Sequence, residues 1–233
     1  MGAAALLTIY VLVYADVCLG VFYLVQDKPQ YSGLFGAILG GGAVFIVTRI
    51  QDYFQGREKV ERTAKALLFE VLERSWRCHI DFHDPWKKYW NGHEERMTAA
   101  RLQKFRPAIP VIFPNLSAEI GLLPARTALA LLRFYSSLEA WSRDLHYWAK
   151  EAHDFDLNKN RTWMRLLVRR SGRTFDPAVQ AIEALSDSIS DADQIIEDYK
   201  NSMPVDRRPH RSILDVLQED KLEANKLVGT PQL

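Results

Sequence analysis

Two apolar runs separated by a short polar segment make up the first fifty residues of the chain. The first run, residues 3–25, contains a single ionisable side chain, Asp16, and the second, residues 33–47, contains none. A hydrocarbon core about 30 Å thick is crossed by roughly 20 helical residues, so both runs are long enough, the second with its flanking residues. The pattern predicts a transmembrane hairpin over residues 1–50, with spans at about 3–25 and 33–50.

Basic residues on the two sides of this hairpin predict its orientation. The polar turn holds one, Lys28, whereas the stretch after the second run holds five, namely Arg49, Arg57, Lys59, Arg62 and Lys65. Short cytoplasmic segments are enriched in Lys and Arg, and the asymmetry therefore predicts that the N-terminus and the C-terminus both lie in the cytoplasm. We expect a multi-pass membrane protein with the turn on the opposite side of the membrane.

The rest of the chain has helical periodicity. Apolar residues recur at steps of three and four, and no run alternates apolar and polar residues over five or more positions. The predicted fold class is all-α, with a helical cytoplasmic domain over residues 51–203. A C-terminal tail over residues 204–233 is expected to be partly helical or disordered.

Proline and glycine set the predicted helix boundaries in this domain. Ser171 and Gly172 are expected to end a short helix, and Pro177 is expected to begin a long one. The predicted helices cover residues 57–83, 125–153, 162–170 and 177–200.

Composition argues against several classes of function. The formal net charge of +1 gives no reason to expect a nucleic-acid partner. Two cysteines in 233 residues do not make a disulfide framework. The sequence contains neither a glycine-rich phosphate loop nor a Gly-x-Ser-x-Gly nucleophile motif. We therefore expect a protein that is not an enzyme and that needs no cofactor.

Polar and small residues within the apolar runs are candidates for function. Asp16 lies near the middle of the first predicted span, level with residues 40–42 of the second. It is either an ion-responsive or pore-lining group, or a protonated side chain that is hydrogen-bonded within the hairpin or between copies. Ser32, Gly36 and Gly40 recur at four-residue spacing, which lets helices approach closely. We expect this stripe to pack on the first helix and to join copies into a homo-oligomer.

A cluster of potential metal ligands lies at the end of the helix predicted over 57–83. His79 and His83 are four residues apart and share one helix face, and Asp84 follows them. These three residues form a candidate metal site, which residues 93–95 could complete. The spacing is not His-Glu-x-x-His, and no second cysteine pair is present. A solvated polar cap at a helix end is the alternative interpretation.

The segment from Phe113 to Pro124 reads Phe-Pro-Asn-Leu-Ser-Ala-Glu-Ile-Gly-Leu-Leu-Pro and is followed by Arg133-Phe-Tyr. It resembles a pattern in bacterial inner-membrane proteins of uncharacterised function, which combine N-terminal transmembrane helices with a small helical cytoplasmic domain. The resemblance implies a location in the cell inner membrane and brings no active site with it. The residues agree with a connection between helices, since Gly121 is typical of a helix end and Pro124 of a helix start.

Taken together, these features predict an integral membrane protein whose helical cytoplasmic domain is an interaction or signalling component. The expected partners are the lipid bilayer, further copies of the chain and a protein of unknown identity. Two alternatives stay open. One is an oligomeric pore or ion-conducting effector with Asp16 along the path, and the other is a metal-dependent activity at His79 and His83.

Overall fold

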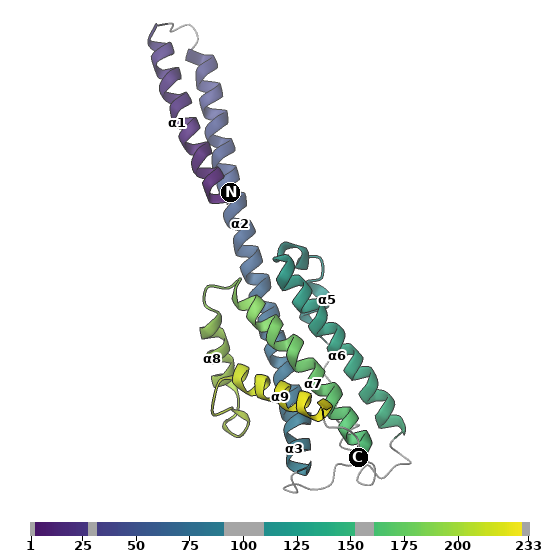
Figure 1. Cartoon of the computed structure of the whole chain (residues 1–233). Helices are drawn as coiled ribbons and strands as arrows, with labels where there is room; N and C mark the ends of the chain where they lie inside the picture. The colour runs from purple at the N-terminus through teal and green to yellow at the C-terminus, as the bar shows by residue number, and fades with distance from the viewer. Residues whose placement is uncertain (1–2, 28–31, 91–109, 152–160, 230–233) are drawn as a thin grey trace. The chain divides into compact units, whose positions relative to one another are not determined.

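The computed structural model describes residues 3–27, 32–90, 110–151 and 161–229, and for some residues within these ranges only the backbone (Figure 1). All regular secondary structure in these ranges is helical, which confirms the predicted all-α class. The chain divides into two compact units, Met1–Lys59 and Val60–Leu233.

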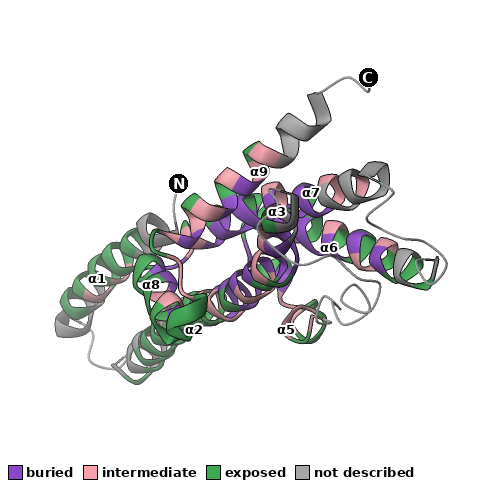
Figure 2. Cartoon of the chain, turned by 90° about the horizontal axis from the view of Figure 1, so that it is seen from below, coloured by how far each residue is buried: buried purple, intermediate pink, exposed green. Residues whose placement is uncertain are grey.

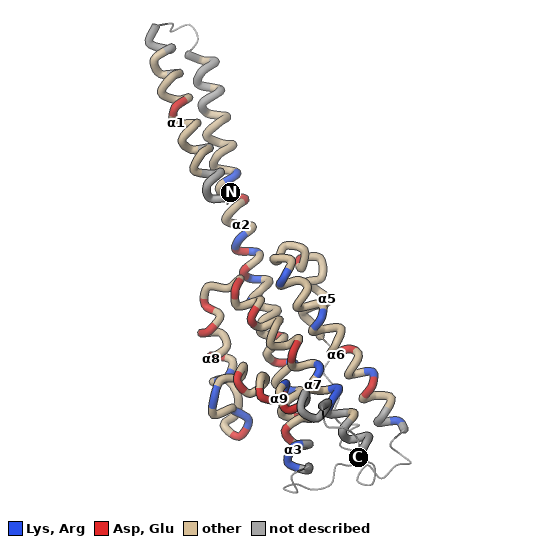
Figure 3. The backbone as a smooth tube through the Cα atoms, viewed as in Figure 1, with Lys and Arg blue, Asp and Glu red and all other residues tan. Residues whose placement is uncertain are grey.

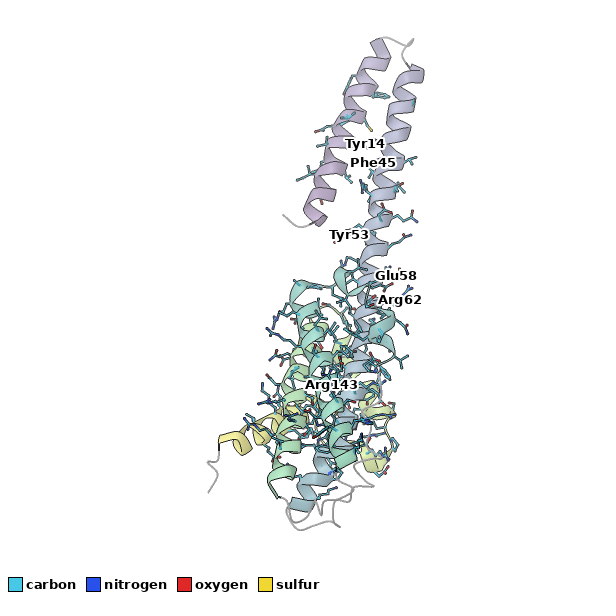
Figure 4. All side chains as sticks on the ribbon, turned by 90° about the vertical axis from the view of Figure 1, so that its right-hand side faces the viewer. Tyr14, Phe45, Tyr53, Glu58, Arg62 and Arg143 are labelled. Carbon is cyan, nitrogen blue, oxygen red and sulfur yellow. The ribbon has the colours of Figure 1, made fainter. Side chains whose placement is uncertain are left out.

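The N-terminal unit consists of α1 (Ala3–Asp27) and the first part of α2 (Ser32–Cys78), which lie side by side (Figure 1). They approach closely at Gly42, where a methyl group in place of the glycine hydrogen would overlap the ring of Tyr14, a residue that Figure 4 labels. The described side chains of both helices are otherwise mostly exposed and apolar (Figure 2).

The prediction of a multi-pass protein of the inner membrane is wrong for this structure. Among the residues that are described, no helix combines the length and the apolar character that a membrane crossing requires.

The C-terminal unit begins within α2 and contains the remaining helices. In chain order these are η2 (His79–His83), α3 (Asp84–Trp90), α5 (Ile112–Asn115), η3 (Ile120–Leu122), α6 (Ala125–Glu151), α7 (Arg161–Ser186), α8 (Ala192–Ser202), η5 (Val205–Arg207) and α9 (Ile213–Gly229). Helix α7 packs against both α6 and α9. Pro124 directly precedes α6, as the sequence predicts.

A single apolar core joins these helices (Figure 2). The longer helices α2, α6, α7, α8 and α9 contribute residues mostly at three- and four-residue spacing, so one face of each is buried. Burying a large apolar side chain contributes about 1.5–3 kcal/mol. The fully buried members include Leu67, Leu68 and Leu72 of α2, Leu131, Phe134 and Trp141 of α6, Phe175 and Ile182 of α7, and Ile213 and Leu217 of α9.

Helix α7 differs from the prediction. It runs without interruption through Ser171 and Pro177, the two expected boundaries, and the actual break lies after Ser186, before α8. Ser171 is fully buried, and its carbonyl accepts a hydrogen bond from the Thr174 hydroxyl at 2.6 Å. A proline inside a helix costs about 3 kcal/mol. Burial of the apolar face around Phe175 offsets that cost, so packing overrides local propensity here.

Replacing this proline tests that account. We expect Pro177→Ala to raise the free energy of unfolding by roughly 1 kcal/mol or more, because it restores a backbone donor inside α7. The urea midpoint measured by circular dichroism reports the change. Pro124→Ala is the matched control, because Pro124 lies outside α6 and the same substitution restores no bond within a helix. An unchanged or lowered midpoint for Pro177→Ala contradicts the account.

Candidate functional site

The end of α2 passes into a single turn of π-helix, η2 (His79–His83). The backbone N–H of Asp84 bonds to the carbonyl of His79, five residues back, which is the π-helical pattern. Turns of this kind hold one residue more than an α-helical turn and often occur at functional sites. In this chain the wider turn carries two histidines.

Both histidines face one carboxylate, that of Asp220 in α9. The Nδ1 atom of His79 lies 2.5 Å from Oδ2 of Asp220, and Nε2 of His83 lies 3.5 Å from Oδ1. Glu223 lies one turn further along α9 and pairs with Lys87 of α3 at 2.8 Å. The ligand atoms of His83, Asp220 and Glu223 all lie within 4.8 Å of one another. We call these three residues and His79 the His–carboxylate cluster.

The centre of the His–carboxylate cluster is closed to solvent. His83 is 0% exposed and Asp220 is 2% exposed. The His79 ring stacks on Trp76 with ring centroids 4.8 Å apart, and the His83 ring meets the edge of Phe175 at 5.2 Å. Aromatic neighbours fix the orientation of both imidazoles. A buried carboxylate is costly without partners, so the histidines also stabilise Asp220.

Burial sets the charge states around the cluster. Desolvation lowers the pKa of His83, and the opposing attraction of Asp220 does not cancel this effect. The His83 imidazole is therefore neutral near pH 7, which is the form that binds metal ions. Burial also acts to lower the pKa of Lys87, but its hydrogen bond to Glu223 and the attraction of the nearby carboxylates together outweigh that and the pKa is raised. Lys87 is thus a fixed positive charge beside the cluster.

Of the three residues predicted as metal ligands, the structure brings two together. His79 and His83 belong to the cluster, whereas Asp84 pairs with Lys88 at 2.8 Å. Residues 93–95 lie outside the described residues. Asp220 was not predicted. The sequence does contain one indication that Asp220 is buried. It follows Leu217 by three residues and therefore falls on the apolar face of α9.

The candidates in the N-terminal unit are not brought together in the same way. Asp16 is exposed and forms no ion pair or hydrogen bond with the described residues. A methyl group on Gly40 would meet nothing within 4 Å, and the close approach lies at Gly42 instead. The side chain of Ser32 and the surroundings of Gly36 lie outside the description. The packing role of this stripe stays a prediction.

A second buried carboxylate, Glu70 of α2, holds the chain around α5. Its oxygens accept hydrogen bonds from the backbone N–H groups of Val111, Ile112 and Phe113 at 2.6, 2.9 and 2.9 Å. The Tyr135 hydroxyl of α6 donates a fourth at 2.7 Å, and its ring stacks on Phe113. These four hydrogen bonds tie the chain around α5 and the side of α6 to α2, which is the arrangement of a structural clamp. We call it the Glu70 clamp.

Comparison of the chain with models of protein families, with curated proteins and with solved structures finds no match. No known relative therefore suggests a function for this chain, and only its residues and their geometry bear on that question.

The Glu70 clamp predicts a dependence of stability on acid. Burial acts to raise the pKa of Glu70, but the backbone and tyrosine hydrogen bonds outweigh it, and the pKa lies below its ordinary value of 4.5. The stabilisation is therefore complete above about pH 4.5 and is lost as the pH falls through the lowered pKa. We expect Glu70→Gln to lower the free energy of unfolding at pH 7 by about 2 kcal/mol or more.

Urea unfolding at a series of pH values measures both effects. As the pH falls through the lowered pKa of Glu70, the difference between the wild type and Glu70→Gln should shrink, because Glu70 is then protonated and, like glutamine, uncharged. Glu139→Gln is the control, since Glu139 makes only an exposed ion pair with Arg143 of the same helix. A difference for Glu70→Gln that stays constant with pH contradicts the account.

Proposed function

We propose that this protein is a non-enzymatic interaction protein that assembles with further copies of itself through its N-terminal unit. One observation carries the proposal. Large apolar side chains are exposed along both helices of this unit, and Figure 2 colours most of the described residues of this unit as exposed. They are Ile9, Val11, Leu12, Val13, Val17, Leu19, Phe22 and Tyr23 of α1, and Val44, Phe45, Val47 and Phe54 of α2.

Twelve large apolar side chains are thus exposed on the two helices of one unit. Soluble monomers rarely expose a contiguous apolar patch of more than a few hundred Å². Burial of each such side chain favours association by about 1.5–3 kcal/mol before the entropic cost of association. The apolar surface of the N-terminal unit therefore needs a partner that covers it.

Charge supports a second copy of the chain as that partner. The described side chains of α1 include one charge, Asp16, and α2 has none before Arg49 (Figure 3). The guanidinium of Arg49 lies 5.2 Å from the ring centre of Phe45 and marks the end of the apolar stretch. A surface with a single charge does not select a strongly charged partner. An identical apolar surface is complementary to it under two-fold symmetry, which is the commonest symmetry of oligomers.

The oligomeric state in detergent-free buffer tests this proposal. We expect sedimentation velocity of the full chain to show a dimer or higher oligomer. The double variant Leu12→Lys with Val44→Lys should raise the dissociation constant at least tenfold, because it buries charge in the contact. Val205→Lys is the matched control, since Val205 is an even more exposed valine in the C-terminal unit.

Flotation with vesicles of neutral phospholipid is the second arm of the experiment. Self-association predicts that the oligomer stays with the protein fraction. A monomer in buffer, or a chain that leaves the oligomer and floats with the vesicles, overturns the proposal, and the second result would assign the apolar surface to lipid.

Asp16 predicts a further effect on assembly. An exposed carboxylate within an apolar contact surface loses hydration when the surfaces meet, so it weakens association. We expect Asp16→Leu to lower the dissociation constant about tenfold or more. Asp52→Leu, on the part of α2 beyond Arg49, should change it little. Weaker association of Asp16→Leu would show that the carboxylate makes a favourable contact between copies.

A further inference from the structure

We propose that the His–carboxylate cluster binds one divalent transition-metal ion, with His83, Asp220 and Glu223 as ligands and His79 as the residue that positions Asp220. The cluster lies wholly within the C-terminal unit, so this site is independent of the proposed self-association. It also differs from the site that the sequence predicts, because two of its three ligands come from α9.

The spacing of the central pair suits two ligands of one ion. Zinc binds imidazole nitrogen and carboxylate oxygen at about 2.0–2.2 Å, so two ligands in tetrahedral geometry lie roughly 3.3–3.5 Å apart. Nε2 of His83 and Oδ1 of Asp220 are 3.5 Å apart. That separation is long for a hydrogen bond and right for a shared ion. With all three ligand atoms within 4.8 Å, Glu223 has to move by about 1 Å to complete the set.

His79 occupies the position of an outer-shell partner. Metal-binding groups are usually held by a second layer of hydrogen bonds, which orients them and tunes their basicity. His79 contacts Oδ2 of Asp220 at 2.5 Å, which leaves Oδ1 directed to His83. Stacking on Trp76 holds the His79 ring in turn. The carboxylate is therefore oriented before an ion binds.

Charge and access agree with an ion of charge +2. Asp220 and Glu223 supply two negative charges, and His83 supplies a neutral nitrogen, a ligand set that suits zinc and related metals. Glu223 has a side chain that is 33% exposed, so an ion can enter from its side although His83 and Asp220 are buried. Lys87 holds Oε1 of Glu223 at 2.8 Å and competes with the ion for that carboxylate.

Binding of zinc to the chelator-treated full chain tests the site. We expect isothermal titration with ZnCl₂ to show one ion per chain. Saturating zinc should also raise the melting temperature, because a ligand that binds only the folded state stabilises it. Cobalt(II) should give the visible spectrum of a low-symmetry nitrogen and oxygen site. The absence of saturable one-to-one binding of either ion overturns the proposal.

Variants assign the ligands. Glu223→Gln removes a half-exposed ligand with little risk to folding and should weaken zinc binding at least tenfold. His83→Ala and Asp220→Asn should abolish it, with circular dichroism as the check on folding. His79→Gln should weaken binding 10- to 100-fold, as expected for an outer-shell partner. Unchanged affinity in Glu223→Gln overturns the assignment, whatever the buried variants do.

Two further variants separate this site from general attraction of cations. Lys87→Met removes the competing charge and should tighten zinc binding severalfold, since Glu223 is then free to bind. Asp84→Asn is the control, because Asp84 pairs with Lys88 outside the cluster, and it should leave the affinity unchanged. Equal losses in Asp84→Asn and Glu223→Gln would indicate non-specific binding and overturn the site.

Discussion

The pairing of buried carboxylates with donors from distant segments is the constraint on which the C-terminal unit depends. Glu70 on α2 could not stay charged in the core without the amides of residues 111–113 and the Tyr135 hydroxyl. These bonds fix where the segment before α6 crosses α2. Asp220 has the same role elsewhere in this unit. It joins α9 to His79 and His83, which lie 141 and 137 residues earlier in the chain. Apolar packing alone is compatible with several registers of helix on helix, and the two carboxylates select one.

Helices that bury most of one face were predictable from the sequence. The start of α6 follows from Pro124, and its length from the periodic apolar residues; the structure confirms a helix from Ala125 to Glu151, and the predicted end at residue 153 lies outside the described residues. The prediction failed in α7, where Ser171, Gly172 and Pro177 all suggest breaks by local propensity. Tertiary packing decided the outcome there, because Phe175 and Ile182 are fully buried only if the helix continues.

Two of the four residues of the candidate site, His79 and His83, were predictable from the sequence. The four-residue spacing of His79 and His83 places them together, but no local pattern names a carboxylate 137 residues away as their partner. Only the position of Asp220 on the apolar face of α9 pointed to a buried role. The apolar runs of the first fifty residues predicted helices correctly, and the inference from apolar helices to an inner-membrane location did not hold.

The π-helical turn also makes the geometry of the histidines sensitive to chain length. A π-helical turn holds one residue more than an α-helical turn, so it accommodates that residue without changing the direction of the helix that follows. Loss of a single residue between His79 and His83 would return η2 to ordinary helical winding. Helix α3, with Lys87, would keep its direction, and the change would fall on the two imidazoles, which would then be three residues apart. A one-residue deletion would therefore disturb the histidines that face Asp220 while leaving the apolar core of α2 in place.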